Sequence, residues 1–287
     1  MAARNIGGDL AAQLEQFRAS HRLQQLRLAG ATWNYLIGGS GSETLVLLPG
    51  GPGIADMAFP YILALEQHFR VVAPGYPAEI GSLDRLLAGL DGFIRAHRIE
   101  RFHLIGASYS GMVVQYLLKS QGSRVRSLLI GDTGVARRER AFVLEMIAAC
   151  LARTPRLGIQ ALLTTALFSL LDGNTPEQQF WRNYLRNAII VATPAELVNR
   201  MQVMIDMDRN WSIGTETPLW RGPTLLLESS NDRLFSSRER EILRARLPQA
   251  EIHTFVGQRH TTALTRAPDY IALMQDFLRR QQMVAGS

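Results

Sequence analysis

Short uninterrupted apolar runs alternate with longer helical patterns over the first half of the chain. Four of these runs have the length and composition of strands buried on both faces: 44–48, 69–74, 102–105 and 125–130. Between them lie stretches such as 82–97, in which leucine, phenylalanine and isoleucine recur at helical spacing. This alternation predicts the α/β class, with a mostly parallel central sheet and helices on both of its faces.

The alternation stops between residues 135 and 220. Four helical patterns follow one another there without a convincing strand, at 136–152, 156–171, 175–190 and 194–208. Strand patterns resume at 223–228 and 250–256, and a last helix is expected over 267–281. We therefore predict one core domain, formed by residues 1–134 and 221–287, with a helical cap of residues 135–220 inserted into it. The aromatic residues and methionines of the insertion are typical of a cap over an apolar pocket, and equally of packed helix faces.

Composition places the chain among globular proteins. Its 287 residues are 47% hydrophobic and 20% charged, enough to bury a sizeable core. Cys150 is the only cysteine, so no intrachain disulfide can form, which fits a reducing compartment. The N-terminal residues lack the apolar stretch of a signal peptide, and no run approaches the ~18 apolar residues of a membrane span. We expect a cytoplasmic protein without a membrane partner.

The basic balance of the chain does not indicate nucleic-acid binding. The net charge is +6 and the isoelectric point about 10.0, but the arginines are spread over the whole sequence and no recognition motif accompanies them. Lys119 is the only lysine, and no phosphate-binding G-K-[ST] motif occurs. Neither a cluster of metal ligands nor a G-x-G-x-x-G cofactor fingerprint is present. We expect a small-molecule substrate, no metal and no cofactor; the oligomeric state stays open.

The segment 106–111, Gly-Ala-Ser-Tyr-Ser-Gly, joins an apolar strand to a helical pattern. A serine on such an abrupt turn is typical of a nucleophile elbow, in which the residues two before and two after must be small. For Ser108 these neighbours are Gly106 and Ser110. For Ser110 the second following residue is Met112, which is too bulky, so Ser108 is the better candidate.

A serine nucleophile needs a base and a group that orients it, and the loops after the last two strands offer both. Asp232 follows one strand and His260 the next, 28 residues later. Because the carboxyl ends of parallel strands meet at one edge of the sheet, both should lie near Ser108. Asp132 also ends a strand and is an alternative acid. The loop at 49–53, Pro-Gly-Gly-Pro-Gly, is either a tight turn or an oxyanion loop with the Gly51 N–H facing the substrate.

Taken together, these segments resemble the α/β-hydrolase fold superfamily over residues 26–281. The loop at 49–53 is similar to that of proline iminopeptidases, and His-Leu-Ile-Gly-Ala-Ser at 103–108 is similar to the maspardin-like branch. The resemblance implies Ser108 as nucleophile, His260 as base and Asp232 as its acid, with the Gly51 and Tyr109 N–H groups forming the oxyanion hole. Three positions depart from the common pattern of the superfamily. Pro49 replaces the common histidine, Ser110 replaces glycine, and Gly75 stands where many relatives have aspartate.

The expected activity is hydrolysis of an ester, thioester or lactone of a small apolar molecule through an acyl-enzyme. Haloalkane and epoxide hydrolysis are disfavoured because those relatives carry aspartate at the elbow. Two alternatives stay open. The same triad could serve amide cleavage of the aminopeptidase kind, carbon–carbon bond hydrolysis or acyl transfer. The fold could also serve a non-catalytic protein that binds a ligand or partner.

Overall fold

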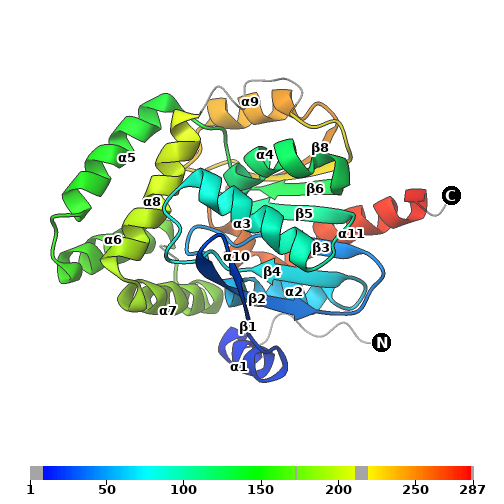
Figure 1. Cartoon of the computed structure of the whole chain (residues 1–287), viewed down its shortest axis with the longest axis horizontal. Coiled ribbons are helices and arrows are strands. Elements are labelled where there is room, and N and C mark those ends of the chain that lie inside the picture. The colour runs from blue at the N-terminus through cyan, green and yellow to red at the C-terminus, as the bar shows by residue number, and fades with distance from the viewer. Residues whose placement is uncertain (1–8, 172, 211–218, 286–287) are drawn as a thin grey trace.

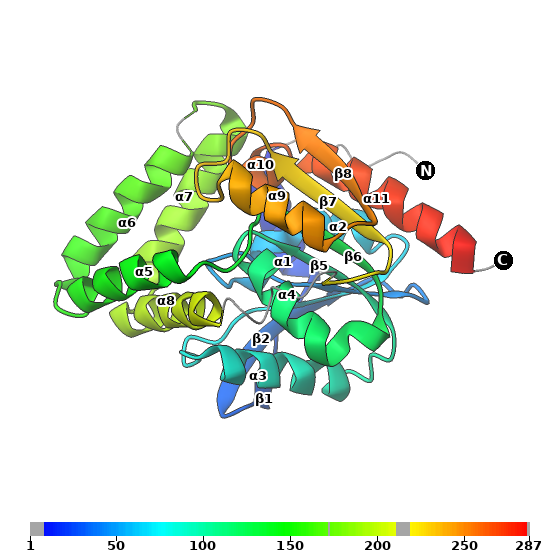
Figure 2. The same ribbon diagram turned by 90° about the horizontal axis from the view of Figure 1, so that it is seen from above.

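An eight-stranded sheet forms the centre of the core domain (Figures 1 and 2). The computed structural model describes residues 9–171, 173–210 and 219–285. The strands are β1 (Gln24–Leu28), β2 (Ala31–Gly38), β3 (Thr44–Leu47), β4 (Arg70–Pro74), β5 (Phe102–Ala107), β6 (Val125–Gly131), β7 (Thr224–Ser229) and β8 (Ala250–Phe255). Their order is β1-β2-β4-β3-β5-β6-β7-β8; the pairs that involve β2 are antiparallel and the others parallel. The predicted mostly parallel sheet is confirmed.

Successive residues of the central strands pack into two separate cores, because side chains alternate between the faces of a sheet. In β7, Leu226 belongs to one core, and Leu225 and Leu227 belong to the other. The first core contains side chains of α3 (Leu83–Ala96), α4 (Tyr109–Gln121) and α9 (Ser237–Arg246). The second contains side chains of α1 (Leu10–Ser20), α2 (Phe59–Leu65) and α11 (Ala267–Ala285). Burial on both faces explains why these strands read as continuous apolar runs.

Local signals set several helix starts. The Ser82 hydroxyl accepts the Arg85 N–H at the start of α3. Ser236 and Glu239 form a capping box at the start of α9, and Thr175 and Gln178 form one at the start of α7. The short elements are η1 (Ala55–Ala58), η2 (Gly122–Arg124) and α10 (Thr262–Thr265).

The insertion between β6 and β7 consists of α5 (Arg138–Leu151), α6 (Arg156–Leu170), α7 (Pro176–Val191) and α8 (Pro194–Arg209). Figure 2 shows these helices set to one side of the sheet. The predicted cap extends to residue 220, and its part at 211–218 lies outside the described residues. Arg140 of α5 joins the cap to the core: it is paired with Asp208 of α8 at 2.7 Å and with Glu239 of α9 at 2.9 Å. Both carboxylates are buried.

Candidate active site

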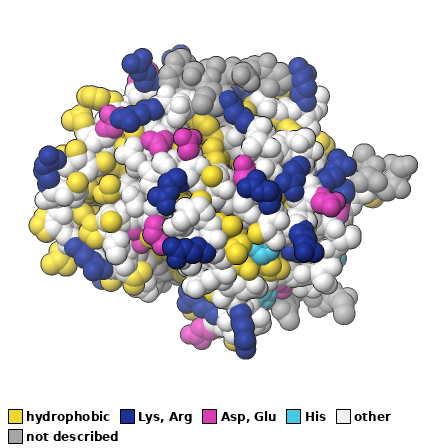
Figure 3. Space-filling model, viewed as in Figure 1, with side chains coloured by type: hydrophobic (Ala, Val, Ile, Leu, Met, Phe, Trp, Pro, Cys, Tyr) yellow, Lys and Arg dark blue, Asp and Glu magenta, His cyan; other side chains and the backbone are white. Residues whose placement is uncertain are grey.

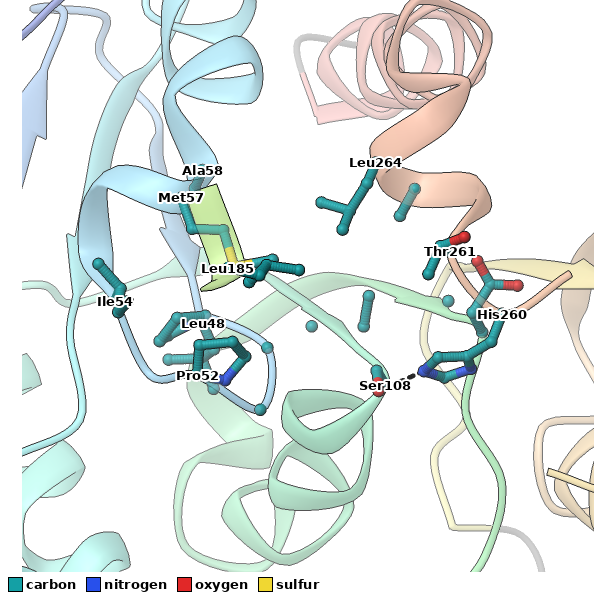
Figure 4. Close-up of a pocket in the computed structure, with 18 of the residues that line it drawn as sticks. Leu48, Pro52, Ile54, Met57, Ala58, Ser108, Leu185, His260, Thr261 and Leu264 are labelled. Carbon is teal, nitrogen blue, oxygen red and sulfur yellow. Dashed lines mark hydrogen bonds between the residues drawn. The ribbon is translucent and has the colours of Figure 1, made fainter. Parts of the chain in front are cut away.

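Ser108 occupies the turn between β5 and α4. Its φ of 56° and ψ of −120° lie where a residue other than glycine is rarely found. Two hydrogen bonds hold this conformation: the Ser108 N–H donates to the Gly131 carbonyl at 2.9 Å, and Thr133 Oγ1 donates to the Ser108 carbonyl at 2.8 Å. The end of β6 thus supports a strained turn that presents Ser108 to the cavity shown in Figure 4.

The turn requires small residues on both sides, as expected. A Cβ atom on Gly106 would lie 2.8 Å from the Ser110 carbonyl oxygen and 2.8 Å from Val114 Cγ2. These distances are shorter than any ordinary carbon contact. Strand β5 and helix α4 therefore pass each other at a separation that only glycine permits at position 106.

The three predicted side chains meet at the carboxyl edge of the sheet. Ser108 Oγ lies 2.7 Å from His260 Nε2, and His260 Nδ1 lies 2.8 Å from Asp232 Oδ2. The other carboxylate oxygen of Asp232 accepts the backbone N–H groups of Leu234 at 2.7 Å and Phe235 at 3.1 Å. The loop after β7 thus fixes the carboxylate, which in turn orients the imidazole toward the serine hydroxyl. Figure 4 shows the His260 ring beside Ser108, with the hydrogen bond between them drawn as a dashed line.

Asp132, the alternative acid, is held elsewhere. Its oxygens accept hydrogen bonds from Ser229 Oγ at 2.7 Å and from the Tyr270 hydroxyl at 3.1 Å, and no hydrogen bond to His260 is present among the described residues. Burial raises the pKa of the Asp132 carboxyl to about 7, although hydrogen bonding to Ser229 opposes the shift. The geometry favours Asp232 as the partner of the imidazole.

Ser110 does not face the cavity. It is fully buried, and its hydroxyl lies 2.8 Å from the Ala107 carbonyl and 3.2 Å from the Leu48 carbonyl, and accepts the Ala107 N–H at 2.9 Å. The second hydroxyl of the elbow therefore ties the turn to the end of β3 and is not presented to a substrate.

The loop after β3 borders the cavity opposite His260. Gly50, Gly51 and Pro52 all line it, and a Cβ atom on Gly51 would meet nothing within 4 Å, so the backbone there faces open space. Tyr109 is the first residue of α4, where N–H groups have no partner within the helix. Gly51 thus lies in the wall of the cavity and Tyr109 directly follows Ser108, and their role as oxyanion donors stays a prediction.

The cavity has a volume of about 610 Å³ and mostly apolar walls. The core contributes residues such as Leu48, Ile54, Met57 and Leu264, some of which Figure 4 shows facing one another across it. The cap contributes Leu163, Ala166, Leu167, Leu170, Leu185, Ala188, Ile189, Val191, Ala192, Glu196, Leu197 and Arg200. Besides Asp132 and His260, its charged lining residues among those described are Glu196 and Arg200.

The sequence did not single out Arg200. The side chain donates to the Tyr76 carbonyl at 3.0 Å and lies over the Tyr76 ring, and no motif marks it in advance. Conversely, the conspicuous cap residues Trp181, Tyr184 and Met207 do not line the cavity: Trp181 donates to the Leu264 carbonyl, and Met207 is in the core. Trp211, another aromatic residue of the predicted cap, lies outside the described residues. Within the described ranges, no three metal-ligating side chains lie together.

Comparison with known proteins identifies the family and the fold. The sequence model of the alpha/beta hydrolase family matches residues 45–272. A hydrolase from Pseudomonas aeruginosa superposes with a TM-score of 0.76 at 19% identity, covering 90% of this chain and 98% of that one. An esterase from Thermogutta terrifontis superposes with a TM-score of 0.75 at 18% identity, covering 90% of this chain and 99% of that one. An enol-lactonase from Burkholderia xenovorans superposes with a TM-score of 0.72 at 17% identity, covering 89% of this chain and 100% of that one. These identities establish a common fold alone. The curated proteins contain no significant match.

Proposed function

The chain belongs to the alpha/beta hydrolase family, and on that premise we propose that it is a serine hydrolase acting on an ester, thioester or lactone of a small apolar molecule. The observation that carries the proposal is the contact of 2.7 Å between Ser108 Oγ and His260 Nε2 at the wall of an apolar cavity. A serine hydroxyl becomes nucleophilic only when a positioned base accepts its proton, and this contact supplies that base.

The reaction proceeds in two halves. His260 Nε2 takes the proton of Ser108 Oγ as the oxygen attacks the substrate carbonyl, and the resulting imidazolium then protonates the departing alcohol or thiol. In the second half the same nitrogen deprotonates a water molecule, which attacks the acyl-serine, and the proton returns to Ser108 as the acid leaves. Asp232, 2.8 Å from Nδ1, holds the imidazole in the required tautomer and stabilises its charged form. The Gly51 and Tyr109 N–H groups would bind the oxyanion, at ~3 kcal/mol for each donor.

The dimensions and lining of the cavity favour a small apolar acyl or alcohol group. A volume of about 610 Å³ is suited to one small molecule. Among the described lining residues, Glu196 and Arg200 are the only charged side chains from the cap. An apolar substrate group therefore gains the most binding free energy when it lies against the cap.

A specific observation favours one alternative, aminopeptidase-like amide cleavage. A free substrate amine requires a carboxylate from the cap, and the sequence offers Glu145, Glu177, Glu196 and Glu216. Of the three that the structure describes, only Glu196 lines the cavity, and Glu145 is paired with Arg209 at 2.7 Å. Glu196 is thus the residue on which this alternative depends.

Labelling with a fluorophosphonate probe tests the proposal. The wild type should be labelled and Ser108→Ala should not, whereas Ser110→Ala, which removes the other hydroxyl of the elbow, should keep the label. A folded wild type that fails to react would refute the hydrolase and favour a non-catalytic binding protein. Labelling that persists in Ser108→Ala would refute the nucleophile.

Rates on nitrophenyl esters then test the acid and the substrate class. Asp232→Asn should lower kcat by roughly 10⁴-fold, as expected when the imidazole loses its orienting carboxylate. Asp132→Asn should retain most activity, and the opposite ranking would reverse the assignment. If aminoacyl anilides are better substrates than esters and Glu196→Gln abolishes that preference, the aminopeptidase alternative holds.

A further inference from the structure

The cap carries a set of large apolar side chains on its outer surface. On α5, Phe142, Val143, Met146 and Ile147 are exposed, and their spacing places them along one face of the helix. On α6 and α7 the exposed members are Leu157, Leu162, Phe168, Ile190 and Val191. We call these nine residues the cap face. Figure 3 shows hydrophobic side chains gathered at the end of the molecule that α5 and α6 occupy in Figure 1.

Their degree of exposure is unusual for residues of this size. Phe142 is 64% exposed, Leu157 80% and Val191 74%. Single exposed apolar residues are normal on a protein surface, but several gathered at one end of a molecule indicate a surface that interacts with a partner. The inner sides of the same helices are occupied: Ala141 and Leu151 of α5 and Leu167 of α6 are buried. The cap face is therefore what remains after the cap has packed against the core.

Arginines lie where the two outer helices meet. Arg153 and Arg156 flank the connection between α5 and α6, both exposed. Arg153 donates to the Ala149 carbonyl and Arg156 to the Ile190 carbonyl, and among the described residues no carboxylate pairs with either. The nearest acidic side chain in sequence, Glu145, is already paired with Arg209. The tip of the cap thus combines exposed apolar groups with uncompensated positive charge.

The cap face also continues into the cavity. Val191 belongs to the face and lines the cavity as well, and Ala166 of α6, two residues before Phe168 of the face, is exposed and also lines the cavity. Leu163 and Ala192, next to them, are lining residues too. An apolar molecule could therefore pass from the cap face into the cavity along an apolar wall.

We propose that the cap face docks the protein onto the surface of an anionic membrane. Apolar side chains on a helix surface bury in the boundary between headgroups and acyl chains, and each arginine near an anionic leaflet adds ~1 kcal/mol. A second copy of the chain fits less well, because a two-fold contact through the tip would bring Arg153 and Arg156 of each copy together without carboxylates. This proposal departs from the expectation of no membrane partner, which was drawn from the sequence before the exposure of these helices was known.

The protein would lie on the membrane. In the described part of the chain no single helix is long and apolar enough to cross a bilayer; α7 and α8 satisfy the length and composition test only as a pair bent by 108°. The proposal does not depend on hydrolytic activity, because binding involves the outer surface of the cap. Ser108→Ala should therefore bind vesicles as the wild type does.

The chain supplies its own reporter for a test. Cys150, the only cysteine, is exposed on α5, three residues after Ile147. An environment-sensitive fluorophore on Cys150 should shift to the blue when vesicles of phosphatidylcholine mixed with phosphatidylglycerol are added, and much less with phosphatidylcholine alone. Co-sedimentation of the unlabelled protein gives the affinity independently of the dye.

Two variants and a matched control complete the experiment. Phe142→Gln combined with Met146→Gln should weaken binding at least tenfold, and Arg153→Gln combined with Arg156→Gln should weaken binding to anionic vesicles roughly 10- to 30-fold. Met283→Gln combined with Arg279→Gln changes exposed residues of the same kinds on α11, at the other end of the molecule in Figure 1, and should bind normally.

Other results of the same experiments would overturn the proposal. A wild type that does not bind anionic vesicles, or that binds neutral ones as tightly, would overturn the proposal. A control variant that loses binding as much as the cap variants would also overturn it. So would self-association without vesicles that is lost in Phe142→Gln combined with Met146→Gln, since the face would then be occupied by a second copy.

Discussion

The buried carboxyl of Asp132 should make the stability of the fold depend on pH in an unusual direction. The side chain lies beneath the active-site edge, 1% exposed, and in the described part of the chain its hydrogen-bond partners are the hydroxyls of Ser229 and Tyr270. Burial, the largest cause, raises the pKa of Asp132 from 3.8 to about 7. The nearby charge of His260 lowers the pKa and that of Asp232 raises it, both less than burial does.

The direction of this pH dependence follows from the protons bound by the folded and unfolded states. Between pH 4 and 7 the folded state holds the Asp132 proton and the unfolded chain has lost it. The stabilisation is therefore complete below pH 4 and is lost as pH rises through 7. Moving the pKa of a carboxyl from 3.8 to about 7 corresponds to roughly 4 kcal/mol of unfolding free energy. Asp132→Asn, which cannot ionise, should lack this loss.

Urea denaturation of the wild type and Asp132→Asn at pH 5 and pH 8 measures the effect. From pH 5 to pH 8 the unfolding free energy of the wild type should fall by roughly 2–4 kcal/mol more than that of Asp132→Asn. Asp84→Asn, which changes an exposed aspartate of α3, should follow the wild type at both. If wild type and Asp132→Asn show parallel pH dependence, the carboxyl ionises as freely in the folded state as in water, and the argument from burial is wrong.

Three further changes test other parts of the structure, each by urea denaturation. Ser110→Ala removes hydrogen bonds to backbone carbonyls and should cost about 1–2 kcal/mol; no loss of stability would mean that the buried hydroxyl is dispensable. Gly106→Ala should cost about 1–3 kcal/mol because its Cβ would lie 2.8 Å from the Ser110 carbonyl oxygen; a neutral result would contradict the close approach of β5 and α4. Arg140→Gln leaves the buried carboxylate of Asp208 without an ion pair, and leaves Glu239 with Arg137 alone at 3.3 Å, so it should cost about 3–5 kcal/mol; a change below 1 kcal/mol would show that Arg140 does not hold the cap.

The local order of the chain could be predicted from its sequence. Strands buried on both faces read as continuous apolar runs, and the helices between them carry apolar stripes at a period of 3.6 residues. Each of the four predicted cap helices has a counterpart in α5 to α8, with ends that differ by no more than two residues. The elbow could be recognised because the close passage of β5 and α4 restricts residue types within a few positions of Ser108, which is information a short segment contains.

The tertiary structure decided what depends on the paths of separate segments. Asp132 and Asp232 have the same signal in sequence, since each follows a buried strand. They differ because the Asp132 carboxyl, on a residue with a φ of 39°, is bonded to Ser229 and Tyr270, whereas backbone N–H groups of its own loop hold Asp232 toward His260.

The exposure of individual cap residues likewise could not be predicted from the sequence. Apolar periodicity predicts where its helices lie but not which side chains face the core, the cavity or the solvent. Trp181 was conspicuous in sequence and packs away from the cavity, while Arg200 carried no signal and lines it. In the sequence, the nine residues of the cap face have the same apolar character as buried helix positions. They are exposed because α5 packs on α8, and α6 on α7, through other side chains. A sequence lists the apolar groups of an element, but only the arrangement of the other elements determines which of them are removed from water.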